Sequence, residues 1–454
     1  MKRTILLIWF LALIIVVKGQ DIKGKQFSMK EAISFAVKNN YTLINSQKDI
    51  EISKKKVKEI ITIGLPQLSG EASFNDFLKI PVMQLPDFFF AGMPGALEGA
   101  PTGALIPVKI QQKYSISGSL TASQLIFDGS YLVGIQAAKV YVQISEKLLQ
   151  KNELDIKLTV GQTYIMALVI DENIKIIDKS LENITKILTE TSIIEQNGFL
   201  EETDVDQIKL LKINLENTKN KLNRQKESTL SLLKFIMGVN IEETIILNDN
   251  LNSLLLEANN QEILNKTVDV KNNFDMQIIS TQEAANKLSL KNNRFGYVPS
   301  LFAFYSYQKD FKGDKINPFA KGVEWFPTSV LGLTLKIPLI DCGTKHFKIQ
   351  QSKLELEKTK VLEKQVEESI KMELINAKSN YLSSFETLKN EQSNMELSKK
   401  IYDKTIIKYK NGTVSSMDLT QNHNQYLNNQ ANYYNSMLEY LVAKIKLDKI
   451  LNQL

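Results

Sequence analysis

Apolar residues recur at helical spacing through the last quarter of the chain. Between Val366 and Leu388 they are three or four residues apart in an 11-residue repeat, which predicts a nearly straight helix. The positions are Val366, Ile370, Leu374, Ala377, Tyr381, Phe385 and Leu388. Farther along, the spacing becomes seven, which is typical of a left-handed coiled-coil seam. The heptad positions are Leu388, Met395, Tyr402 and Tyr409, followed by Leu419, Tyr426, Tyr433, Tyr440 and Leu447.

Residues that break helices are almost missing from the same region. No proline follows Pro338, and the only later glycines are Gly343 and Gly412. The segment 343–454 is therefore predicted to form one helical hairpin. Its turn is expected at Lys410–Val414, because Asn and Gly tolerate positive φ, and Ser415 or Ser416 can cap the returning helix. The first arm would be a rod of roughly 100 Å, which must pack against other rods along its length.

A second pattern, with a period of two, accompanies the prolines. All ten prolines lie in residues 66–107 or 299–338, so these windows are predicted to be non-helical. Apolar and hydroxyl residues alternate along 114–123, and apolar residues occupy every second position along 331–337. Such alternation is typical of membrane β-strands with one lipid face and one water face, although a sheet over a soluble core remains an alternative. The expected strand pairs are 68–80 with 111–127, and 300–311 with 328–341.

Four short motifs occur twice and in the same order, which predicts an internal two-fold repeat. Two of them recur at an offset of 233 and two at an offset of 214, so the first copy carries a 19-residue insertion between Pro66 and Gly129. In both copies the hairpin glycine follows the strand-end glycine by 69 positions. The matching motifs are Val37–Tyr41 with Val270–Phe274, Leu65–Leu68 with Val298–Leu301, Phe127–Gly129 with Asp341–Gly343, and Asn197, Gly198 and Asp204 with Asn411, Gly412 and Asp418.

Four strands are too few to close a barrel, and open sheet edges are not tolerated in lipid. Several protomers are therefore expected to share one barrel. The insertion, rich in Pro, Gly and aromatic residues at 86–95, is expected at the hairpin tip between the first two strands. Long loops of outer-membrane barrels face the outside, so this loop is predicted to be extracellular.

Composition and charge narrow the classes of function. Lys2 and Arg3 precede an apolar run that predicts a secretory signal peptide at residues 1–19, with a retained membrane anchor as the alternative. Removal of that segment reduces the formal net charge from +6 to +3, which implies no nucleic-acid partner. One cysteine, Cys342, and two histidines offer no disulfide and no histidine-rich metal site. No nucleophile motif or phosphate loop occurs, so we expect no enzyme activity, cofactor or metal site.

The chain resembles the TolC-like outer-membrane efflux proteins over essentially its whole mature length. Individually weak motifs carry this resemblance through their repeated spacing; they are Ser28–Ile33 with Asn39 and Asn40, Leu65–Leu68, Ile337–Gly343, and Tyr409–Thr413 with Asp418 and Leu419. The sequence departs from the pattern at Cys342, where glycine is common, at Leu125–Phe127, which lacks the proline, and in having no lipid-anchor cysteine.

The resemblance implies a homotrimer in the outer membrane of a Gram-negative bacterium. A twelve-stranded β-barrel would continue into a helical tunnel across the periplasm, an α-barrel. The tips would dock on a periplasmic adaptor and an inner-membrane transporter of an efflux or type I secretion system. Two other classes remain as alternatives. A periplasmic adaptor would have one hairpin flanked by β-domains, and a structural coiled-coil surface protein would not explain the paired strands.

We therefore predict a mixed α and β membrane protein with long helical hairpins and four strands per protomer. The expected segments are 1–19 signal peptide, 20–65 N-terminal helices, 66–128 first strand pair with the long loop, 129–238 first helical hairpin, 239–260 equatorial connector, 261–298 second-repeat helix, 299–342 second strand pair and 343–454 second helical hairpin. The strand–helix junctions are expected at Pro66, Gly129, Pro299, Pro338 and Gly343.

The candidate site is at the hairpin tips. Adaptor docking is expected at Asn197, Gly198, Asn411, Gly412 and Thr413. Asp204 and Asp418 each follow a hairpin glycine by six residues, so a trimer would carry six carboxylates near one level, as a gate. The alternative is that each is a first-turn acid favoured by the helix dipole, with Ser415 and Asp418 as a capping pair.

Overall fold

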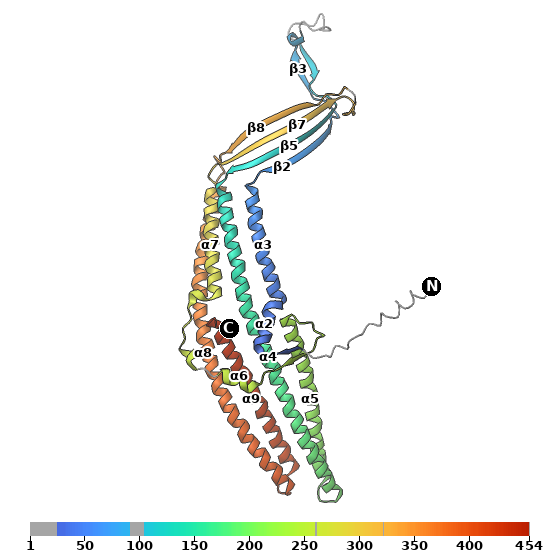
Figure 1. The fold of residues 1–454 in the computed structure, drawn as a ribbon, viewed down its shortest axis with the longest axis vertical. Helices are drawn as coiled ribbons and strands as arrows, with labels where there is room; N and C mark the ends of the chain where they lie inside the picture. Colours follow the sequence, from blue (N-terminus) through green and yellow to red (C-terminus); the bar gives the residue numbers. More distant parts are fainter. Residues whose placement is uncertain (1–24, 91–103, 259–260, 321, 454) are drawn as a thin grey trace, which may run out of the picture. The chain divides into compact units, whose positions relative to one another are not determined.

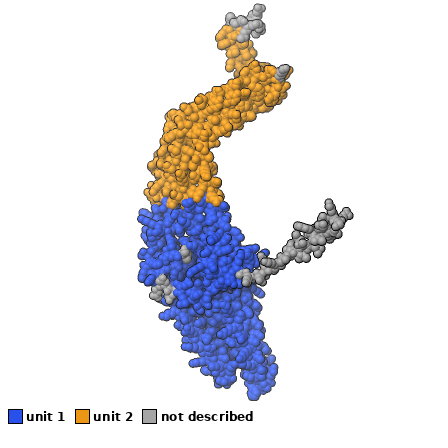
Figure 2. Space-filling model, viewed as in Figure 1, with its two compact units in different colours: residues 1–50, 145–280, 362–454 blue, residues 51–144, 281–361 orange. Residues whose placement is uncertain are grey.

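The computed structural model describes residues 25–90, 104–258, 261–320 and 322–453. The expected signal peptide and most of the expected extracellular loop lie outside these residues. The chain divides into two units, one of residues 1–50, 145–280 and 362–454 and one of residues 51–144 and 281–361 (Figure 2).

The helices are α2 (Met29–Asn39), α3 (Tyr41–Ile63), α4 (Gly129–Gln196), α5 (Glu202–Met237), α6 (Leu251–Ala258), α7 (Phe274–Phe295), α8 (Thr344–Lys410) and α9 (Ser416–Ile450), with short 3-10 turns η1 (Asp87–Phe90), η2 (Gln261–Asn265) and η3 (Val270–Asn272). The strands are β1 (Lys25–Phe27), β2 (Gln67–Asp76), β3 (Val82–Pro86), β4 (Leu105–Lys109), β5 (Tyr114–Phe127), β6 (Ile245–Leu247), β7 (Ser300–Gly313) and β8 (Phe326–Lys336).

The second unit contains one four-stranded sheet in the order β2-β5-β7-β8. This order makes β2 and β8 the two edges (Figure 1), and all neighbouring strands are antiparallel. The predicted pairings of β2 with β5 and of β7 with β8 are confirmed. The predicted bounds were too long at three ends, since β2 stops at Asp76, β5 begins only at Tyr114 and β8 stops at Lys336.

A separate hairpin of β3 and β4 follows β2 and was not predicted. Its strands contain Pro86 and Pro107, which had indicated loop structure. Each proline removes one backbone donor, which is tolerated on a strand that is an edge. Both strands of a two-stranded hairpin are edges, so proline is compatible with this position.

The first unit contains the distal parts of two helical hairpins, α4 with α5 and α8 with α9. The predicted apolar series faces inwards as expected: each residue of the 11-residue and heptad series is buried or half-buried, and none is exposed. Tyr440, Leu419 and Leu447 are fully buried. Their burial follows from the helical spacing, which puts residues three, four and seven apart on one face.

Short elements from two parts of the chain pack on these helices. The strand β1 pairs in parallel with β6, and a capping box of Ser28 and Glu31 begins α2. In α6, Leu251, Leu254 and Ala258 belong to the same buried cluster as Tyr381 and Tyr440. Within the described residues, no helix has an apolar stretch long enough and uncharged enough to cross a membrane.

Candidate functional site

Both hairpin turns end their first helix with the same backbone geometry. Gly198 has φ of 79° and Gly412 has φ of 69°, the left-handed conformation that glycine adopts without a Cβ clash. The N–H of Gly412 donates to Tyr409 O at 2.9 Å, and that of Thr413 donates to Lys408 O at 3.0 Å. The corresponding bonds run from Gly198 and Phe199 to Glu195 and Ile194. This pair of bonds is the Schellman motif, so the predicted turns are confirmed.

The two returning helices begin differently. At α9, the Ser415 hydroxyl accepts from the Asp418 N–H at 3.2 Å, and the Asp418 carboxylate accepts from the Ser415 N–H at 3.1 Å. These reciprocal bonds are the predicted capping pair. Bonds from the Ser415 hydroxyl and backbone lower the pKa of Asp418 because they stabilise its charged form. Glu201, the N-cap of α5, has no such side-chain bond.

Asp204 connects the two hairpins. The hydroxyl of Ser416, at the start of α9, donates to the Asp204 carboxylate, and the same oxygen lies 2.9 Å from the amide oxygen of Gln207. Ser416 is only 1% exposed. The sequence had offered Ser415 or Ser416 as the cap of α9; Ser415 takes that position, which leaves Ser416 to bind Asp204. This bond was missed because the two residues are 212 positions apart.

Two further contacts join the hairpins near their tips. The Lys410 ammonium lies 2.8 Å from the Glu190 carboxylate, and the hydroxyls of Thr191 and Tyr409 are 3.2 Å apart. Beside them is a groove of about 690 Å³, whose apolar lining includes Ile187, Ile193, Ile194, Phe199 and Val414. Phe199 is 81% exposed. The tips thus present an apolar surface next to the Asp204 carboxylate.

His423 lies on α9 in a buried aromatic cluster that the sequence did not single out. Its ring meets Tyr402 edge to face at 4.9 Å, and Tyr402 stacks on Tyr426. Neither ring nitrogen of His423 has a hydrogen-bond partner among the described residues, and the Tyr402 hydroxyl has none either. Burial lowers the pKa of His423 to about 4. The residue is therefore neutral at pH 7. Its only signal in the sequence is its position four residues after Leu419, a spacing that is common on buried helix faces.

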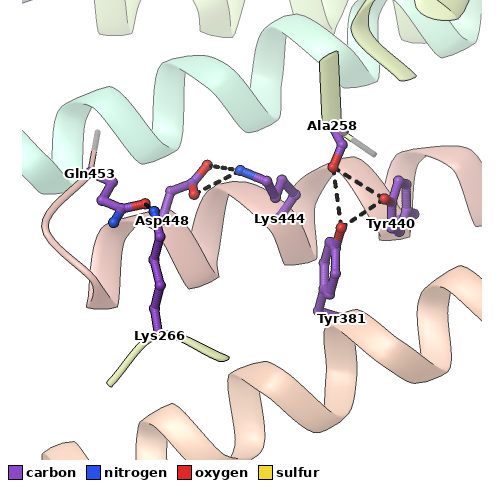
Figure 3. Close-up of polar contacts among 7 residues, drawn as sticks. All are labelled: Ala258, Lys266, Tyr381, Tyr440, Lys444, Asp448 and Gln453. Atoms are coloured by element: carbon purple, nitrogen blue, oxygen red, sulfur yellow. Dashed lines mark hydrogen bonds and ion pairs between the residues drawn. The ribbon is translucent and has the colours of Figure 1, made fainter. Parts of the chain in front are cut away.

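A tyrosine pair holds the end of α6 against the two helices of the second hairpin (Figure 3). The hydroxyls of Tyr381 on α8 and Tyr440 on α9 are 2.9 Å apart, and each lies 3.2 Å from the Ala258 carbonyl. Lys444 forms an ion pair with Asp448 at 2.7 Å on the same helix as Tyr440. Both tyrosines belong to the predicted apolar series, but the polar role of their hydroxyls was not predicted.

The predicted strand–helix junctions lie in the second unit. Pro66 and Pro299 directly precede β2 and β7, and Pro338 follows the end of β8. Gly129 opens α4 at a close approach, since a Cβ there would lie 2.3 Å from the Phe295 ring. Gly343, with φ of 90°, precedes α8. Pro66 and Pro299 therefore lie where a helix gives way to a strand, and Gly129, Pro338 and Gly343 lie where a strand gives way to a helix.

Comparison with known proteins gives matches to solved structures alone. No protein-family model matches the sequence, and no curated protein shows a significant match. CusC, studied for folding and transmembrane channel formation, has a TM-score of 0.71 at 14% identity, covering 93% of this chain and 91% of that chain. The CmeC outer membrane channel of Campylobacter jejuni has a TM-score of 0.69 at 17% identity, covering 94% and 85%. The outer membrane protein VceC of Vibrio cholerae has a TM-score of 0.67 at 12% identity, covering 93% and 95%. The chain therefore has the fold of the TolC-family outer-membrane channels, as the sequence resemblance predicted.

Proposed function

We propose that the chain is one protomer of a homotrimeric exit duct in the outer membrane of a Gram-negative bacterium. The duct would pass substrates from an inner-membrane transporter and its periplasmic adaptor to the outside without enzymatic chemistry. One observation carries the proposal: the four-stranded sheet exposes an apolar face and leaves two open edges.

The strand register gathers apolar residues on one face of that sheet. Leu331 pairs with Tyr305, which pairs with Ala122, which pairs with Leu68. Because residues opposite each other share a face, this row spans all four strands. Leu331 is 81% exposed and Leu68 is 75% exposed. An exposed apolar face of this extent marks contact with lipid or protein.

The opposite face carries hydroxyl groups. Ser73 and Ser117 are 2.7 Å apart across β2 and β5, and Thr121 and Ser306 are 3.0 Å apart across β5 and β7. A sheet with one apolar and one hydroxyl face suits a barrel with lipid outside and water inside. The alternative of a sheet over a soluble core is weaker, because Leu331 and Leu68 on its apolar face are exposed.

The two edge strands of the sheet support a barrel that is shared between chains. Within the described residues, β2 has only β5 as a neighbour and β8 has only β7, so each edge has unpaired backbone groups. In lipid such groups need partners. Three chains, each joining its β8 to the β2 of the next, would close twelve strands. That count exceeds the eight strands of the smallest single-chain barrels.

The helical segments would form the tunnel, and the tips its periplasmic entrance. The two-fold repeat is supported by the similar lengths of α4 and α8, 68 and 67 residues, and of α5 and α9, 36 and 35 residues. We propose that the adaptor docks at Asn197–Gly198 and Asn411–Thr413, beside the apolar groove. We further propose that Asp204 and Asp418 set the charge of the entrance. In this proposal residues 239–260 form the equatorial connector.

Fractionation of the expressing cells, followed by electrophoresis with and without boiling, tests the proposal. A membrane barrel shared by three chains should fractionate with the outer membrane and migrate as a trimer until it is heated. A protein that fractionates with the soluble periplasm, or shows no heat-dependent migration, would instead favour an adaptor or a coiled-coil protein.

A further inference from the structure

The exposed face of α9 carries only carboxamides over most of its length. Between Leu419 and Leu438, every exposed residue of this helix is Asn or Gln. These residues form the carboxamide stripe, which consists of Gln421, Asn424, Gln425, Asn428, Asn432 and Asn435. At 100° per residue they cover an arc of about 100°, which is one face of the helix. No side chain of the stripe has a hydrogen-bond partner within the described part of the chain, so all are free to bind water.

This composition is unusual for an exposed helix face. From Leu419 to Leu438 the sequence contains no Lys, Arg, Asp or Glu, although such residues make up 23% of the chain. The returning helix of the first hairpin, α5, exposes charged residues such as Asp206, Lys209 and Glu216 in the corresponding stretch. Asn is a weaker helix former than Lys or Glu, so the amide face costs helix stability. Folding alone therefore does not account for the stripe.

The stripe borders a groove without charged residues. A hollow of about 450 Å³ lies between α4, α5 and α9, and none of its described lining residues is charged. Asn428 and Asn435 of the stripe contribute to that lining, together with Asn214 and Gln225 of α5. The neutral surface therefore extends from the stripe towards the first hairpin.

Charged residues stand at both ends of the stripe. Asp418 lies three residues before Gln421, and Glu439 lies four residues after Asn435, and both are exposed. The spacing of 418, 421, 425, 428, 432, 435 and 439 alternates threes and fours, so these positions share one seam. A helix that presents Asp418 to the entrance of the duct therefore presents the stripe to the same water-filled space.

We propose that the carboxamide stripe of α9 lines the duct next to its entrance and forms a neutral, hydrated wall that passes solutes of either charge. This inference rests on the proposed duct and goes beyond it, because it assigns the lining. Each carboxamide offers both donors and an acceptor, so it holds water without creating a field of one sign. Charge selection would then be confined to Asp418 and the other acids at the ends of the stripe.

Ion selectivity in planar bilayers tests the lining directly. The double variant Asn428→Asp with Asn432→Asp would add six carboxylates per trimer, and we expect the cation-to-anion permeability ratio to rise by about tenfold. The double variant with lysine at the same positions should shift the ratio in the opposite direction. The matched control is Asn217→Asp with Asn220→Asp, two exposed amides of α5 outside the groove lining, which should leave the ratio unchanged.

Labelling of an introduced cysteine tests the lining even if the charged variants fail to fold. Asn428→Cys in a Cys342→Ser background should react with a cationic methanethiosulfonate reagent in the assembled trimer and lose conductance. Conducting trimers with unchanged selectivity would overturn the lining, and so would an equal shift in the α5 control. Loss of the trimer in the charged variants, with no reaction at Asn428→Cys, would place the stripe between chains and also overturn it. A wild-type trimer that does not conduct would instead overturn the proposed duct itself.

Discussion

His423 is neutral, buried and without a charged partner, and this makes it a source of acid sensitivity. Burial alone lowers its pKa to about 4, from an ordinary value of 6.5. Burial raises the pKa of Tyr402 and Tyr426, which lie beside His423, and the charge of the nearby Asp403 raises it further. As pH falls from 6.5 towards 4, the unfolded chain binds a proton on this histidine before the folded chain does. Stability is therefore complete above pH 6.5 and is lost progressively below it.

We predict that His423→Leu removes this pH dependence. Through this residue, the wild type should lose about 3 kcal/mol of unfolding free energy per chain between pH 6.5 and pH 4. The total loss in the variant should be smaller than that of the wild type by the same amount. Denaturant unfolding across this pH range measures the difference. The exposed His346 supplies the control, because His346→Leu leaves the buried His423 and its acid sensitivity in place. An identical slope in His423→Leu would show that another group is responsible.

Asp418 and Asp204 differ in what they bind, so their replacement should have different effects. Asp418 is held in its own cap with a lowered pKa, and its contribution to stability is present at neutral pH and is lost as pH falls through that lowered value. Asp418→Asn should destabilise the start of α9 slightly, because the helix loses a first-turn acid that its N-terminal dipole favours. If Asp418 also acts as a gate, Asp418→Asn should weaken the preference of the channel for cations, and the double variant with Asp204→Asn should weaken it further. Single-channel recordings distinguish the gate from the cap. An unchanged cation preference in the double variant would mean that Asp418 acts only as a helix cap.

At the scale of elements, the hairpin tips form one surface made by two distant parts of the chain. Crosslinking residues placed at Phe199 or Thr413 should capture the adaptor, because both lie at the Schellman turns and Phe199 is largely exposed. A crosslinking residue at the exposed Asn183, on α4 away from the turn, is the control and should capture it far less. Mass spectrometry of the crosslinked bands identifies the partner. Capture of neighbouring copies alone would contradict docking at the tips.

The β3–β4 hairpin carries the insertion, and its geometry suits a clean deletion. Leu85 pairs with Ile106, so removal of residues 86–103 would leave Ala104 and Leu105 as a two-residue connection, the shortest common hairpin loop. We expect the shortened chain to reach the outer membrane as a trimer, because the first copy alone has this segment. Unboiled electrophoresis of membrane fractions detects the trimer. Its absence would mean that the insertion takes part in assembly.

Sequence patterns were sufficient where one residue type decides the local structure. The buried series on α8 and α9, the Schellman glycines and the Ser415 cap all follow from spacing or from a single preferred conformation. The contact of Asp204 with Ser416 could not be predicted, since it depends on how two hairpins pack. The isolation of His423 could not be predicted either, because unpaired ring nitrogens are a property of the surrounding packing and not of any local motif.

At the scale of the whole molecule, the central claim is that three chains complete one barrel by joining β8 of each to β2 of the next. The sheet order makes this junction antiparallel, like every other pair in the sheet. Both edge strands are exposed along nearly their full length in the single chain. The proposed duct would therefore depend on this junction.

Disulfide trapping across the two edges tests that claim most directly. In a Cys342→Ser background, Ser69→Cys of β2 is combined in turn with Thr328→Cys, Val330→Cys or Thr334→Cys of β8, and membranes are oxidised before denaturing electrophoresis. The account predicts that at least one combination gives covalent dimers and trimers and nothing larger, while either single cysteine gives no trimer. Monomers at every register, or a ladder that continues beyond three chains, would contradict a closed barrel of three protomers.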